Sequence, residues 1–330
     1  MICRMLTDNY GRNVSSLRVQ VNTTCNFGCF FCHMEGTGIQ ANEMPAIQII
    51  RIIEAAHRLG INKVKFTGGE PTLRRDIVEI VRRTREIITG DISMTTNGTR
   101  LKQLASGLRE AGLDRINVSM HSIDREGFRF ITGVDAIERV VEGIACAREA
   151  GFDNIKVNFV ALKGINVDQI PKMIDLSARE KFMLQIIEYE VPREQETSDE
   201  YLKYHYSLDR LEEDLSSRSF RIDHNSIHER PVFRINTEYG EASVEIVKPM
   251  RNYEFCNKCT RMRVTSLGEL KPCLMTTGDL TPVFRKGMET TDEEIENAFS
   301  IATLKRKPYW TREDKIESEV LCETERINQY

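Results

Sequence analysis

Residues 17–32 read Leu17-Arg18-Val19-Gln20-Val21-Asn22-Thr23-Thr24-Cys25-Asn26-Phe27-Gly28-Cys29-Phe30-Phe31-Cys32. A strand-like run leads into a loop that carries three closely spaced cysteines, a glycine and aromatic side chains. Three thiolates at this spacing can hold one [4Fe–4S] cluster and leave its fourth iron without a protein ligand, whereas clusters that only carry electrons are usually closed by four cysteines. The stretch therefore predicts an iron–sulfur cluster with an open iron, at which chemistry takes place.

Two other interpretations of the same cysteines are a zinc site and three unrelated thiols. Structural zinc normally takes four ligands, which come from paired Cys-x2-Cys arms. A compact set of three cysteines lacks the fourth ligand, so the spacing favours the cluster.

A second motif follows one strand and one helix later. The apolar run Val64-Lys65-Phe66-Thr67 ends in Gly68-Gly69-Glu70-Pro71, whose glycines allow the backbone to approach a ligand closely. Together, the CxxxCxxC spacing, the aromatic residue before the last cysteine and this Gly-Gly-Glu-Pro sequence resemble the signature of the radical SAM enzymes. The resemblance implies that the open iron chelates S-adenosylmethionine (SAM), that one electron cleaves its S–C5′ bond, and that the resulting 5′-deoxyadenosyl radical abstracts a substrate hydrogen. Glu70 is expected to orient or neutralise cationic groups.

The first part of the chain alternates β-rich runs with amphipathic helical stretches, which is typical of βα units around a parallel sheet. Six units cannot close an eight-stranded barrel, so we expect an α/β fold in which residues 1–192 form an open, partial TIM barrel with ligands at the C-terminal ends of the strands. Residues 193–330 form a smaller C-terminal region. The predicted strands are Leu17–Asn22, Lys63–Phe66, Ile92–Thr95, Arg115–Ser119, Lys156–Leu162 and Leu184–Tyr189, and the predicted helices are Ala46–Leu59, Ile77–Ile88, Leu101–Ala111, Ile137–Ala150 and Gln169–Arg179.

The C-terminal region contains three short predicted strands and then a second group of three cysteines. The strands lie near Phe220–Ile222, Val232–Ile235 and Ser243–Val247, and the cysteines are Cys256, Cys259 and Cys273. Three thiolates again predict a [4Fe–4S] cluster with an open iron. The passage from Glu254 to Leu274 closely resembles the C-terminal cluster region of the GTP 3′,8-cyclases of molybdenum-cofactor biosynthesis, and Leu184-Gln185-Ile186-Ile187-Glu188 resembles archaeal members of that family.

The resemblance to this family implies the ligands of both clusters, of SAM and of GTP. A triphosphate requires several cationic side chains, and guanidinium groups bind phosphate oxygens in a bidentate manner. If residues 261–263 are extended, the Arg-x-Arg pattern places both guanidinium groups on one side of a strand. The implied residues are Cys25, Cys29 and Cys32 for the first cluster, Cys256, Cys259 and Cys273 for the second, Phe31, Gly69 and Ser119 for SAM, and Arg18, Lys65, Thr96, Lys156, Arg261 and Arg263 for GTP.

Each of these cations also has a structural interpretation: the lysines as surface charges, and Arg18 as a member of a structural ion pair. The sequence departs from the bacterial pattern of the family at several positions. Lys65 and Gln185 stand where arginines are usual, Glu190 stands where a methionine often contacts SAM, and His121 takes the place of an aspartate. The terminal Gly-Gly of bacterial members is absent, because the chain ends Arg326-Ile327-Asn328-Gln329-Tyr330.

The composition excludes several classes of protein. The net charge of −4 argues against a general nucleic-acid surface. No apolar run approaches the roughly 20 residues of a membrane span, and the first residues lack the apolar core of a secretory signal, so we expect a cytoplasmic protein. In that compartment nine cysteines indicate metal or redox chemistry more than disulfides.

The resemblance implies further partners. These are a ferredoxin- or flavodoxin-type reductant and a downstream pyranopterin synthase. One alternative function is a peptide-modifying radical SAM maturase, because Gly268-x4-Cys273 also resembles the start of an auxiliary-cluster domain. A non-enzymatic alternative is a binding module in which the C-terminal cysteines hold structural zinc.

Overall fold

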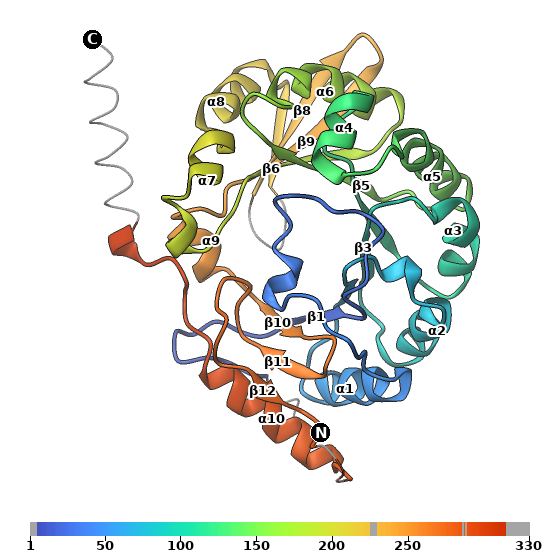
Figure 1. Cartoon of the computed structure of the whole chain (residues 1–330), viewed down its shortest axis with the longest axis vertical. Helices are drawn as coiled ribbons and strands as arrows, with labels where there is room; N and C mark the ends of the chain where they lie inside the picture. Colours follow the sequence, from blue (N-terminus) through green and yellow to red (C-terminus); the bar gives the residue numbers. More distant parts are fainter. Residues whose placement is uncertain (1–4, 225–229, 286, 288, 315–330) are drawn as a thin grey trace.

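The computed structural model describes residues 5–224, 230–285, 287 and 289–314. The chain end, residues 326–330, therefore lies outside the described residues. Inner strands are surrounded by an outer layer of helices, and the segment after β1 crosses the centre of the ring (Figure 1). The six predicted strands are confirmed with shifts of at most two residues at their ends. They are β1 (Ser16–Gln20), β2 (Val64–Thr67), β3 (Ile92–Thr96), β4 (Arg115–Ser119), β5 (Ile155–Ala161) and β6 (Met183–Glu188).

The five predicted helices are also confirmed. Between β4 and α5 the structure contains a further helix, α4 (Arg125–Thr132), which the sequence analysis does not assign. This helix is short, and the Asp124 side chain caps its first turn by accepting a hydrogen bond from the Gly127 N–H at 2.7 Å. The other helices of this part are α1 (Ala46–Arg58), α2 (Ile77–Ile87), α3 (Leu101–Glu110), α5 (Ile137–Glu149) and α6 (Ile170–Arg179).

The C-terminal region extends the same sheet at both of its edges. Strand β9 (Gly240–Val247) pairs in parallel with β6, and β10 (Arg261–Val264) pairs in parallel with β1. The sheet stays open, with the order β12-β11-β10-β1-β2-β3-β4-β5-β6-β9-β8-β7. Its outer strands are antiparallel: β7 (Arg221–His224) and β8 (Pro231–Thr237) beyond β9, and β11 (Glu269–Lys271) and β12 (Thr281–Pro282) beyond β10.

The remaining helices belong to the C-terminal half. Helix α10 packs along α1, where Arg51 lies 2.9 Å from Asp292 and Arg58 lies 2.6 Å from Glu296. No helix among the described residues is long and apolar enough to cross a membrane. These helices are α7 (Asp199–Tyr204), α8 (Asp209–Arg218), α9 (Tyr253–Asn257) and α10 (Asp292–Leu304), and short 3-10 turns lie at Met34–Gly36, Pro71–Leu73, Val167–Gln169 and Arg193–Gln195.

Side chains along the strands point alternately to the hydrophobic core under the helices and to the concave face of the sheet. In β5, Ile155, Val157, Phe159 and Ala161 are buried, while the residues between them are half-buried. Successive side chains of a strand point to opposite faces. The apolar set packs under the helices, and the other set, Lys156, Asn158 and Val160, lines a cavity inside the curve of the sheet.

Candidate active site

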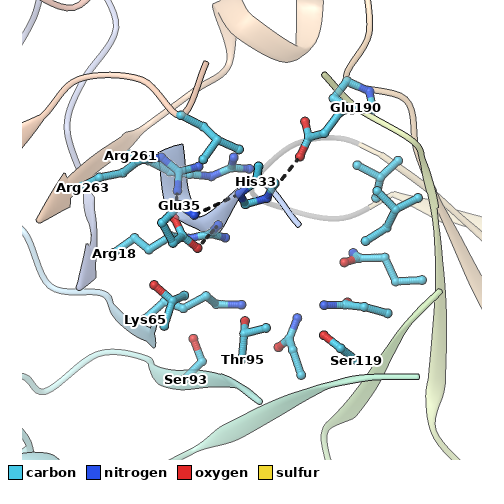
Figure 2. A pocket seen from close by; sticks show the side chains of 18 of the residues that line it. Arg18, His33, Glu35, Lys65, Ser93, Thr95, Ser119, Glu190, Arg261 and Arg263 are labelled. Atoms are coloured by element: carbon cyan, nitrogen blue, oxygen red, sulfur yellow. Dashed lines mark hydrogen bonds and ion pairs between the residues drawn. The ribbon is translucent and has the colours of Figure 1, made fainter. Parts of the chain in front are cut away.

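Every residue that the sequence predicts to bind iron, SAM or GTP lines one cavity of about 470 Å³. This volume lies within the range of small-molecule sites, which is roughly 300–1,000 Å³. Figure 2 shows side chains from several strands converging on the cavity, among them those of Arg18, Lys65, Ser119, Arg261 and Arg263. The structure therefore brings together residues that are separated by more than half of the chain.

The two N-terminal motifs are packed directly against each other. The Gly69 N–H donates to the Asn22 carbonyl at 3.0 Å, and the Glu70 N–H donates to the Thr24 carbonyl at 2.8 Å. A Cβ atom at Gly69 would lie 2.4 Å from the Thr24 carbonyl oxygen and 2.5 Å from that of Thr23. Glycine is therefore required at position 69 to let the Gly-Gly-Glu-Pro loop support the start of the cysteine loop.

The residues of the first cysteine group fit a cubane cluster. All three are free and line the cavity, and burial raises their pKa values, that of Cys29 to about 12. The charges of Cys25 and Cys32 also act on Cys29, so the thiols lie close together. No three such groups among the described residues converge on one ion. A cubane does not need that convergence, because each thiolate binds a different iron.

Aromatic side chains surround this loop. The Phe31 ring lies 5.0 Å from His121 and 6.1 Å from Tyr189, between ring centroids. Burial lowers the pKa of His121 to about 4, so its ring is neutral at pH 7, and its Nδ1 accepts the Val160 N–H at 3.1 Å. At position 121, where the bacterial pattern of the family has an aspartate, this chain therefore has a neutral ring beside Phe31.

Glu70 lies in a network of hydrogen bonds beside the cavity. Its buried carboxylate accepts hydrogen bonds from the Thr72 hydroxyl at 2.5 Å, the Thr96 hydroxyl at 2.6 Å and the Asn97 N–H at 2.6 Å. Glu70 therefore joins the loops after β2 and β3. Burial raises its pKa. Thr96 lines the cavity, but its hydroxyl is used in this network.

Two buried arginines hold the second cysteine segment in place. Arg12 donates to the Cys256 carbonyl at 2.8 Å, and Arg306 donates to the Cys259 carbonyl at 2.5 Å. Both guanidinium groups pair with the same carboxylate, that of Asp8, at 2.9 and 3.2 Å. The N-terminal segment and the residues after α10 therefore fix the backbone that carries these two cysteines.

The chemistry of the second thiol set also fits a cluster. Cys256, Cys259 and Cys273 are free and half-buried, and the charges of Cys259 and Cys273 act on Cys256, whose pKa burial raises to about 11. Burial also raises the pKa of Cys259, but Arg261 and other nearby arginines outweigh it and lower that pKa below the ordinary value. A thiolate is the form that binds metal, so this cationic surrounding favours iron binding.

The register of the sheet places three of the predicted GTP-binding cations in one row. Arg263 on β10 is opposite Arg18 on β1, which is opposite Lys65 on β2. Burial, followed by the charges of Arg18, Arg115, Lys156 and Arg261, lowers the pKa of Lys65 well below its usual value. An anionic ligand would relieve this repulsion, because it would supply the missing negative charge.

Glu35 is the counter-ion of this row, and the sequence analysis does not identify it. Its carboxylate pairs with Arg263 and lies 3.6 Å from Arg18 (Figure 2). Burial raises its pKa, but the two guanidinium groups outweigh this and lower it to about 2. Glu35 and its neighbour Met34 both have positive φ angles, 53° and 46°, and Lys271 Nζ donates to the Gly36 carbonyl at 2.6 Å. The first cysteine loop is therefore tied to β10 and β11.

Two further acidic residues lie in or near the site. One differs from the bacterial pattern of the family, and the other was not predicted from the sequence. Glu190, at a position where a methionine is usual, lies 4.0 Å from His33 Nε2, while His33 Nδ1 accepts the Glu35 N–H. Glu245 is fully buried and pairs with Lys156 at 2.6 Å. A single carboxylate in the apolar strand pattern Ser243–Val247 is the signal that could have found it, since a buried charge needs a partner.

Comparison with known proteins defines the class to which this fold and site belong. Residues 19–177 match the model of the radical SAM superfamily, and residues 182–312 match the model of the family Molybdenum Cofactor Synthesis C. The chain is a radical SAM protein, and its family implies a [4Fe–4S] cluster and SAM.

The relatives define the family more narrowly. A protein of the archaeon Thermoplasma volcanium named "Probable GTP 3′,8-cyclase" is 51% identical over 97% of this chain and 98% of its own length. A protein of Thermococcus kodakarensis with the same name is 46% identical over 93% of this chain and 100% of its own length. The chain belongs to the family of these GTP 3′,8-cyclases, as the sequence analysis predicted.

Solved structures with low sequence identity share the fold. Streptococcus suis SuiB bound to precursor peptide SuiA has a TM-score of 0.63 and 20% identity, over 86% of this chain and 64% of SuiB. The structure of anSMEcpe with bound AdoMet has a TM-score of 0.56 and 17% identity, over 81% of this chain and 76% of that protein. At these identities the likeness shows a common open α/β fold only.

The contact at Gly69 predicts the effect of Gly69→Ala. The added methyl group would push the loop backbone at residues 23–24 aside, and overpacking of this kind costs about 1–3 kcal/mol. We expect SAM to bind about tenfold or more weakly in equilibrium dialysis of the reconstituted protein. Gly278→Ala is the matched control, because nothing lies within 4 Å of a Cβ atom there. Equal SAM affinity of the two variants would contradict the role of Gly69.

The lowered pKa of Glu35 predicts a pH-dependent contribution to stability. A carboxylate whose pKa falls from 4.5 to about 2 on folding stabilises the protein above pH 4.5, on the order of 3 kcal/mol, and loses this contribution between pH 4.5 and 2. We expect Glu35→Gln to lower the free energy of urea unfolding at pH 7, and the gap from wild type to narrow below pH 4.5. The exposed Glu293→Gln is the control. A gap that stays constant from pH 7 to 3 would disprove the assignment.

Proposed function

We propose that this chain is a GTP 3′,8-cyclase, a radical SAM lyase that converts GTP into 3′,8-cyclo-7,8-dihydro-GTP in molybdenum-cofactor biosynthesis. The observation that carries the proposal is the single cavity lined by both cysteine sets, with a row of cations along its wall. The family of the chain supports the same conclusion. The similarity to SuiB gives less support to the alternative of a peptide substrate, because the two proteins share only the fold.

We assign cofactors to the cavity as follows. Cys25, Cys29 and Cys32 hold the first [4Fe–4S] cluster, and Phe31, Gly69 and Ser119 contact SAM. Cys256, Cys259 and Cys273 would hold a second [4Fe–4S] cluster, which would supply a binding site for the guanine base. When bound at the first cluster, SAM would supply a radical able to take the C3′ hydrogen of GTP, and the residues of the cavity would hold C3′ near C8 of guanine.

The side chains of the cavity would bind and orient GTP. Guanidinium and ammonium groups grip phosphate oxygens, and contact at both the phosphates and the base restricts the reacting carbons to one geometry. Glu35 keeps Arg18 and Arg263 oriented, and the aromatic side chains around Phe31 exclude water. The assigned GTP-binding residues are Arg18, Lys65, Thr96, Lys156, Arg261 and Arg263.

The proposal extends to the organisation and the partners of the protein. Residues 1–192 would be the part that generates the radical, and residues 193–330 the part that adds the second cluster. Electrons would come from a ferredoxin- or flavodoxin-type protein in the cytoplasm, and the cyclised nucleotide would pass to a pyranopterin synthase.

Anaerobic turnover with GTP deuterated at C3′ tests the function. The reconstituted protein is supplied with SAM and a reductant, and the products are analysed by mass spectrometry. We expect deuterium in 5′-deoxyadenosine together with a cyclised nucleotide. Cleavage of SAM that ignores GTP would reject the cyclase function and direct the search toward peptide substrates.

A cysteine variant tests the second cluster separately. Cys273→Ser should reduce the iron content from about eight to about four per chain, because one cubane would be lost. SAM cleavage at the first cluster should persist, whereas formation of the cyclised nucleotide should fall below detection. Cys146→Ser, on α5 and outside the cavity lining, is the matched control. An unchanged iron content in Cys273→Ser would contradict the assignment.

A further inference from the structure

Behind the part of the cavity wall that is formed by Lys156, Gln185 and Arg230 lies another buried carboxylate, that of Glu245. Glu245 lies on β9, where β9 joins β6, and is 0% exposed. Its Oε2 atom lies 2.6 Å from Lys156 Nζ and 2.9 Å from Gln185 Nε2. Its Oε1 atom lies 2.8 Å from the guanidinium of Arg230, which immediately precedes β8. One carboxylate thus holds two cations on its two oxygens.

Arg230 does more than neutralise the charge of Glu245. Lys156 and Arg230 together carry one more positive charge than Glu245 neutralises, and both line the cavity. The Arg230 side chain is only 18% exposed. Arg261 is also close, since its charge lowers the pKa of Arg230 after the larger effect of burial. A buried cationic excess of this kind favours an anion.

The closest contact of this ion pair joins Arg230 Nε and Glu245 Oε1 at 2.8 Å. The guanidinium group of Arg230 also carries two terminal nitrogens, and Arg230 lines the cavity. Two parallel N–H groups match the oxygens of a phosphate group, which an ammonium group binds only as a point charge. Lys156 and Arg230 therefore bind different oxygens of Glu245, and both line the same cavity. One supplies an ammonium group and the other a guanidinium group.

We propose that Arg230 is a further substrate-binding residue, which with Lys156 binds a phosphate group of the nucleoside triphosphate. The identity of the nucleotide in this inference rests on the proposed function. The expectation that an anion binds here rests on the geometry around Glu245. Glu245 is a positioning residue, because it orients both cations without touching the substrate.

Binding measurements on the full-length, reconstituted protein test the proposal without turnover. GTP and guanosine are titrated by equilibrium dialysis in the absence of SAM and reductant. A charge-assisted hydrogen bond contributes enough for Arg230→Gln to weaken GTP binding by about tenfold or more. Guanosine, which has no phosphate, should bind as in wild type. Arg230→Lys keeps the charge but loses the two-pronged geometry, and it should give an intermediate loss.

Arg234→Gln is the matched control. Arg234 lies on β8, pairs with Asp223 and Glu241 at 3.0 Å, and is outside the cavity lining. It should leave GTP binding unchanged. Wild-type GTP affinity in Arg230→Gln would overturn the inference, and so would an equal loss for GTP and guanosine, which indicates a structural role of Arg230.

One further titration separates this inference from the proposed function. If wild type binds neither GTP nor guanosine, the cyclase proposal fails, and inorganic triphosphate becomes the probe. Weaker binding of triphosphate to Arg230→Gln than to wild type and Arg234→Gln would still support a phosphate site at Arg230. Equal binding by all three proteins would reject it.

Discussion

The ion pairs of Glu35 are the interaction on which the rest of the site depends. Arg18 and Arg263 face each other on neighbouring parallel strands, and two guanidinium groups in this position repel unless an anion lies between them. Glu35 supplies that anion from the first cysteine loop. Because Arg263 belongs to the segment between Cys259 and Cys273, one buried carboxylate links the two groups of cysteines across most of the chain.

The same arrangement recurs at the other edge of the six-stranded core. Where β9 joins β6, Glu245 pairs with Lys156 of the core and with Arg230 of the C-terminal region. Each edge of the core thus gains one parallel strand, one buried acid and additional cations. The C-terminal region therefore completes the wall of the cavity and also carries three cysteines that line it.

Local pattern predicted much of this architecture. Period-two and helical patterns located the six core strands within two residues, because the strands bury an apolar face and amphipathic helices lie between them. The cysteine spacing and the Gly-Gly-Glu-Pro sequence identified the class, since a cluster loop and its backbone support are continuous in the chain. Helix α4 was missed because it is short. The hydrogen-bond partners of Glu70 were missed because Thr96 and Asn97 lie at the end of the next strand along the chain, where local spacing does not reach.

The sequence by itself determined the core strands, both sets of thiols and the cationic side chains near the ends of the strands, since these depend on local spacing and chemistry. Only the tertiary structure decided which charges face each other. The pairing of β10 with β1 and of β9 with β6 joins segments that are distant in sequence, and sheet register then sets the partners of Glu35 and Glu245. Such long-range pairing depends on the burial of whole faces, which no local stretch of residues encodes.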